Sequence, residues 1–123
     1  MTQKYIEGDV VMYDNKVMVV KEPRDGSHFD LSCPKEGLVY CLVDIDEIKP
    51  VSLTPEILEK NGWVKDKEGY INDSYHLHLC DKYDRYSVYK VVNDNIVWLT
   101  DVRNVSDLQH LLFGLGLNSE MEV

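Results

Sequence analysis

The sequence of 123 residues lacks several features that mark large classes of proteins. It has no apolar run near the roughly 18 residues that cross a bilayer. No apolar segment follows the lysine in its first ten residues, so we expect no membrane helix and no signal peptide. Its three cysteines, Cys33, Cys41 and Cys80, form no CxxC pair. Free thiols in a reducing cytosol account for them, and we expect a cytoplasmic protein.

Positive charge is also scarce, since 13 basic residues face 22 acidic ones and the formal net charge is −9. Residues 1–53 carry ten acids and six bases, and residues 54–123 carry twelve and seven. Both halves would repel a phosphate backbone, so direct nucleic-acid binding is not expected. An acidic decoy of a host nucleic-acid-binding protein is an alternative, but a decoy should concentrate its charge along one stripe.

What the sequence does contain indicates a globular protein rich in strands, with 44% apolar and 28% charged residues. Segments 8–13 and 16–22 are rich in Val and flank Asp14-Asn15, a pair suited to a two-residue hairpin turn. Segments 28–33 and 38–43 follow, and 44–53 leads into a last short strand. Residues 1–53 therefore predict an SH3-like small β-barrel, with a plain meander sheet as the competing arrangement.

The clearest local signal predicts a helix over residues 55–61. Thr54 suits the N-cap and Pro55 the first helical position. Leu53 and Leu58 have the spacing of a hydrophobic staple, and Asn61-Gly62 ends the helix. This short helix should reverse the chain between the two halves.

The second half, residues 54–123, predicts an α+β arrangement that shares an interface with the first. Extended segments around Lys67-Glu68-Gly69, and those at 74–83, 86–94 and 96–101, favour an antiparallel sheet because short turns join them. An apolar stripe predicts a helix over 105–114, capped by Asn104 or Ser106, and residues 119–123 suggest an edge strand. The predicted fold class is mainly β, or α+β, with two short helices.

The segment SYHLHLC places His76, His78 and Cys80 at alternate positions of a predicted strand, on one face. A small metal-dependent enzyme built on this face is one functional alternative. Zinc would need further ligands, however, and His28 and His110 lie in unrelated segments. The alternation has a simpler cause in a buried leucine face, so we predict no metal and no cofactor.

A second cluster, Ser27, His28 and Asp30, contains the residue types of a hydrolytic triad. Neighbours on a strand point apart, and the chain has no GxSxG turn to expose the serine. We interpret this segment as a polar loop that enters a strand, and we predict no catalytic residue.

Aromatic and apolar residues predict a contact surface instead. Tyr86 and Tyr89 belong to a tyrosine-rich pair of strands, and tyrosine is enriched at protein interfaces. The segment LLFGLGL holds more apolar residues than one helical stripe can bury, which leaves Phe113 or Leu117 for a protein partner or a second copy.

Two segments resemble a known family. IKPVSLTPEILEKNGW (48–63) and VSDLQHLLFGLGLNSEMEV (105–123) are similar to small uncharacterised proteins of Bacteroides and related bacteria, found in prophages, phages and mobile elements. In the second segment Leu108-Gln109 fits the family pattern, whereas Ser106 stands where the family has histidine. The resemblance implies a bacterial cytosolic or virion-associated protein and assigns no activity. We therefore predict a non-enzymatic accessory or structural protein that acts through protein contacts.

Overall fold

The computed structural model describes residues 5–123, which form two five-stranded antiparallel sheets and two α-helices. The first sheet has the order β4-β3-β2-β1-β5 and consists of β1 (Val10–Tyr13), β2 (Lys16–Pro23), β3 (His28–Cys33), β4 (Leu38–Asp44) and β5 (Lys49–Pro50). The second has the order β10-β9-β8-β7-β6 and consists of β6 (Val64–Lys65), β7 (Gly69–Asn72), β8 (Leu77–Asp81), β9 (Tyr86–Val92) and β10 (Asn95–Val102). The predicted class of a mainly β protein is confirmed.

The first sheet begins with the predicted hairpin. Asp14 and Asn15 join β1 to β2 with φ values of 52° and 60°, the left-handed conformation that this two-residue turn requires. A 3-10 turn, η1 (Ile45–Glu47), precedes β5, which pairs with β1. Within residues 5–123 β4 does not pair with β5, so the pairing does not close the sheet into the predicted barrel.

Helix α1 (Pro55–Lys60) begins where predicted and ends one residue earlier than expected, with the predicted residues at both caps. The Thr54 side chain accepts a hydrogen bond from the Ile57 N–H. Gly62 has a φ of 88°, and the Trp63 N–H donates to the Leu58 carbonyl, which closes the helix. Leu58 and Trp63 are both buried in the same core.

Helix α2 (Val105–Gly114) has the predicted bounds and begins with a capping box between Asn104 and Asp107. The hairpin predicted around Lys67-Glu68-Gly69 is confirmed, since β6 pairs with β7, and Gly69 is the first residue of β7. Two other predictions were wrong in detail. Residues 119–123 have no regular secondary structure instead of forming an edge strand. Strand β9 ends at Val92 and not at residue 94, because Asn93 and Asp94 form the turn before β10.

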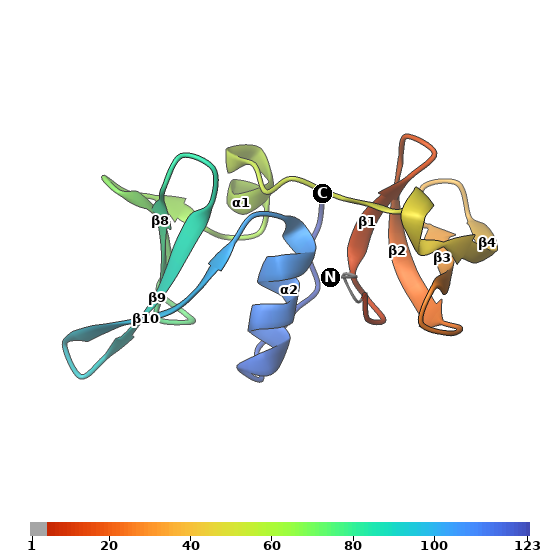
Figure 1. Ribbon diagram of the computed structural model, residues 1–123. Helices are drawn as coiled ribbons and strands as arrows, with labels where there is room; N and C mark the ends of the chain where they lie inside the picture. The colour runs from red at the N-terminus through yellow and green to blue at the C-terminus, as the bar shows by residue number, and fades with distance from the viewer. Residues whose placement is uncertain (1–4) are drawn as a thin grey trace.

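The α2 helix lies between the two sheets (Figure 1). The first sheet has its own core, which includes Val11, Met18 and Leu31. The larger core joins α1, α2 and the second sheet to Val10, Val51 and Leu53 from the first half. Because Val10 and Val11 are neighbours on β1 and point to opposite faces, β1 contributes to both cores.

Polar contacts reinforce this junction. The Gln109 side chain accepts a hydrogen bond from the Val10 N–H at 2.8 Å and donates to the Gly8 carbonyl at 2.9 Å. The Asp9 carboxylate lies 2.7 Å from His110 Nε2 and also accepts from the Ile6 N–H. The Gln109 side chain of α2 thus bonds the backbone at Gly8 and Val10 as a neighbouring strand would, at a point where the described part of the chain supplies no such strand. No helix within residues 5–123 is both long and apolar enough to cross a membrane.

Candidate functional site

A continuous row of side chains crosses the second sheet on the face that points away from its core. The register aligns one residue from each of its five strands: Val64 in β6, Ile71 in β7, His78 in β8, Tyr89 in β9 and Trp98 in β10. Directly opposed residues in adjacent strands have neighbouring side chains. We call these five residues the outer row.

Alternation along the strands explains why the outer row is exposed. Leu77, Leu79 and Val88 point to the opposite face and are fully or nearly fully buried in the larger core. The outer row belongs to neither core. Trp98 at one end is 56% exposed and Val64 at the other end 63%, whereas the three residues between them are half-buried. The row therefore forms a partly exposed and mostly apolar surface.

Asp101 holds the indole of Trp98 in place. The Trp98 Nε1–H donates to Asp101 Oδ1 at 3.2 Å, and the Ser87 hydroxyl donates to the same oxygen at 2.8 Å. Arg85 donates to Asp101 Oδ2 at 3.0 Å. Hydrogen bonds from Ser87, then Trp98 and then Arg85 lower the pKa of Asp101. An exposed aromatic side chain that is fixed before binding loses little entropy when it contacts a partner.

A hollow of about 310 Å³ lies beside the outer row and includes His78, Cys80 and Tyr89 in its walls. Asp66 is near, but its carboxylate accepts the backbone N–H groups of Glu68 and Gly69 and so stabilises the turn before β7. No group of three or more His, Cys, Asp or Glu side chains in the described part of the chain is placed to hold a metal ion.

The prediction that His76 shares a strand face with His78 and Cys80 was wrong. His76 lies in the turn before β8 with a φ of 56°, and β8 begins only at Leu77. Its left-handed backbone breaks the alternation on which the predicted face depended. The candidate metal set is therefore reduced to His78 and Cys80 on β8.

The loop before β3 brings Ser27 and His28 together, but with Asp25 instead of Asp30. The Ser27 hydroxyl and the Asp25 carboxylate both lie 3.1 Å from His28 Nδ1, and Ser27 also donates to Asp25. A catalytic triad needs the serine and the acid on different ring nitrogens. Asp30 instead binds the Leu42 N–H and the Arg24 side chain. This cluster has the geometry of a turn, not of a triad.

This turn predicts a change in acid stability. The Ser27 backbone N–H, followed by the His28 side chain, lowers the pKa of Asp25 from 3.8 to about 2. A carboxyl with a lowered folded-state pKa adds stability above pH 3.8 that is lost as the pH falls toward 2. We expect Asp25→Asn to be less stable than the wild type at pH 5 and nearly equal to it at pH 2. Urea unfolding of both proteins at the two pH values measures this, and a constant difference would contradict it.

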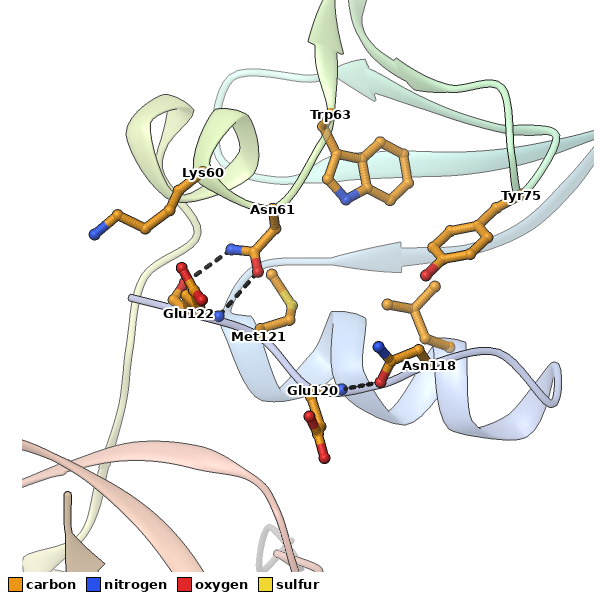
Figure 2. Close-up of a pocket in the computed structure, with 9 residues that line it drawn as sticks. Lys60, Asn61, Trp63, Tyr75, Asn118, Glu120, Met121 and Glu122 are labelled. Atoms are coloured by element: carbon orange, nitrogen blue, oxygen red, sulfur yellow. Dashed lines mark hydrogen bonds between the residues drawn. The ribbon is translucent and has the colours of Figure 1, made fainter.

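A second hollow, of about 450 Å³, lies where the C-terminal segment crosses α1 (Figure 2). The Asn61 side chain donates to the Glu122 carbonyl at 2.8 Å and accepts from the Glu122 N–H at 2.9 Å. One side-chain amide therefore pairs with the segment as a neighbouring strand would. Met121 and Val123 pack against the larger core beside it.

The four residues predicted to form a contact surface lie in different surroundings. Phe113 is 65% exposed at the end of α2, whereas Leu117 packs against the larger core. Tyr89 is half-buried in the outer row. Tyr86 lies in the core, where burial raises the pKa of its hydroxyl, so it offers little surface to a partner.

Sequence reasoning missed Val64, Ile71 and Trp98, the apolar members of the outer row. Each stands in a segment that has apolar residues on both faces, so alternation could not separate the exposed face from the buried one. Comparison of the chain with protein-family models, with curated proteins and with solved structures found no match in any of the three.

Proposed function

We propose that this chain is a non-enzymatic accessory protein of a phage or mobile element that binds another protein through the outer row of its second sheet. The observation that carries the proposal is the partly exposed, mostly apolar outer row that ends at the exposed Trp98, with its indole held by Asp101. Fixed, exposed aromatic side chains are typical energetic centres of protein interfaces. The resemblance of residues 48–63 and 105–123 to phage and prophage proteins supports the biological setting.

The two-part organisation supports the same role. We infer that residues 1–53 are an SH3-like half and residues 54–123 an α+β half joined to it by α2. Four consecutive antiparallel strands and a fifth that returns to the first are the pairings from which such a small barrel is built, and these pairings support the inference. The Gln109 and His110 contacts would hold the second sheet in a constant orientation, with its outer row free.

Affinity capture from a Bacteroides lysate, with and without phage infection, tests the proposed function. We expect the wild-type protein to retain a defined partner and Trp98→Ala to retain at least about ten-fold less of it, since truncation of an aromatic residue that dominates an interface costs on the order of 2 kcal/mol or more. Quantitative mass spectrometry measures the retained amount.

Phe113→Ala is the matched control, because Phe113 is as exposed as Trp98 and lies on α2, away from the outer row. Retention of the partner by this variant is expected. Loss with Phe113→Ala alone would move the contact to α2 and contradict the outer row as the binding surface. Retention of the partner by both variants would also contradict the outer row as the binding surface. Circular dichroism verifies that both variants are folded.

A further inference from the structure

The sheets present four edges, and they differ in how open they are to another strand. β5 and β6 have two residues each. β4 is interrupted where Cys41 and Leu42 face Asp30, with Leu42 at a φ of 55°. β10 has eight residues, and within residues 5–123 only β9 pairs with it. Short length and irregular backbone protect the first three edges, so β10 is the most open one.

The first half of β10 lacks the usual protection of an edge strand. The strand contains no lysine and no proline, and its bulge falls between Trp98 and Thr100, after the regular segment Asn95–Trp98. Val92 and Asn95 flank the two-residue turn and form a hydrogen-bonded pair, as such turns require. Alternation then directs the backbone N–H and C=O groups of Ile96 and Trp98 outward.

We propose that the β10 edge binds an extended segment of a different protein, apolar at its centre and basic at both ends, as a sixth strand of the second sheet. This inference rests on the proposed function and names the kind of partner. Free backbone groups at Ile96 and Trp98 select a polypeptide in extended form, the mode known as strand addition.

The apolar centre of the segment follows from the side chains on this edge. Ile96, which is 64% exposed, and Trp98 lie two residues apart on the outer face. An added strand would place its own side chains beside these two and lengthen the outer row by one position. Asn95–Thr100 contains no charged residue, so an apolar segment meets no unpaired charge there.

The basic ends follow from the charges around this uncharged stretch. Asp94 lies in the turn at one end, and Asp84 and Asp101 share the single guanidinium of Arg85 at the other. Arg103 follows the strand, and Lys90 donates to the Tyr75 carbonyl on the opposite face. The edge keeps an excess of negative charge in a chain of net charge −9. A second copy is disfavoured, since antiparallel β10 strands would bring Asp94 near the second Asp101.

Titration with two synthetic peptides tests the proposal. Both have an alternating Val and Thr centre, one with two lysines at each end and one with two glutamates. We expect the lysine peptide to shift the Trp98 emission to shorter wavelength and to protect the Ile96 and Trp98 amides from hydrogen exchange. The glutamate peptide should bind at least about ten-fold more weakly, and added salt should narrow the difference.

Ile96→Pro and Ile96→Ala form the matched pair of variants. Both remove the side chain, but only proline removes the outward N–H, and proline is tolerated at an edge. We expect Ile96→Pro to bind the lysine peptide at least about ten-fold more weakly than Ile96→Ala. Should the proline variant not fold, the amide exchange of the wild type decides by itself.

Equal binding of both peptides, or no protection of the Ile96 and Trp98 amides, would overturn the proposal. A dimer in light scattering with these amides protected in the absence of peptide would also overturn it, in favour of a second copy. If neither peptide binds but the Trp98→Ala variant still fails to retain the captured partner, strand addition is rejected and the proposed function stands. If the lysine peptide binds but Trp98→Ala retains the captured partner as well as the wild type does, the proposed function is rejected and strand addition stands.

Discussion

Replacement of Gln109 with leucine is expected to lower the free energy of unfolding by about 1–3 kcal/mol, because a buried backbone N–H would lose its partner. Gln109 is only 3% exposed. Its side chain accepts from the Val10 N–H and donates to the carbonyls of Gly8 and Ser119. Leucine fills a similar volume but satisfies none of these groups. The loss would fall on the junction between the two halves.

Urea unfolding followed by circular dichroism measures this effect. Phe113→Leu, on the same helix and at an exposed position, is the control and should change the stability by less than about 0.5 kcal/mol. An equally small effect of Gln109→Leu would show that water or a rearranged backbone satisfies the Val10 N–H. The Gln109 contacts would then not be what joins the first sheet to α2.

Local signals in the sequence predicted the elements whose ends are set by neighbouring residues. Asp14-Asn15 and Thr54 each act within a few residues of their position, and the hairpin and α1 form where they predict. The 105–114 helix begins where predicted because Asn104 and Asp107 cap its first turn locally. Such signals are independent of the rest of the fold, so a single sequence is enough to detect them.

Contacts between distant residues could not be predicted in this way. Gln109 pairs with Gly8 and Val10 across about a hundred positions, and Asn61 pairs with Glu122. Residues 119–123 were predicted to form an edge strand, but their backbone bonds to the side-chain amides of Gln109 and Asn61, at Ser119 and Glu122, and not to a strand. The prediction that His76 lies on a strand failed for another reason, since a left-handed turn residue can occupy a position that fits a strand pattern.

The candidate site illustrates the same limit. Each member of the outer row is an ordinary residue within its own strand. The row exists only because the registers of four strand pairs align Val64 through Trp98. Register depends on turn geometry and on the buried face, and neither can be derived strand by strand from sequence. The surface was therefore visible only in the folded chain, although Tyr89 was predicted to contribute to a contact surface.

Replacement of Gly69 with alanine is expected to destabilise the protein by about 2–4 kcal/mol, through overlap with the backbone of the neighbouring strand. A Cβ atom at Gly69 would overlap the Leu79 carbonyl oxygen and lie 3.1 Å from the Asp81 nitrogen. Both are main-chain atoms of β8, held by the β7–β8 ladder and by the bond from the Asp81 N–H to the Glu68 carbonyl. They cannot rotate away as a flexible side chain would, so the strands must separate locally.

Gly114→Ala makes the same chemical change at an uncrowded position and is expected to have the opposite effect on stability. Gly114 ends α2, and a Cβ atom there would meet nothing within 4 Å. Alanine favours the helix over glycine by up to about 1 kcal/mol, so this variant should be neutral or more stable. Urea unfolding of both variants tests the pair. If Gly69→Ala were as stable as Gly114→Ala, the β7–β8 spacing would have to be wider than described. His78 and Ile71, paired across those strands, would then not be neighbours in the outer row.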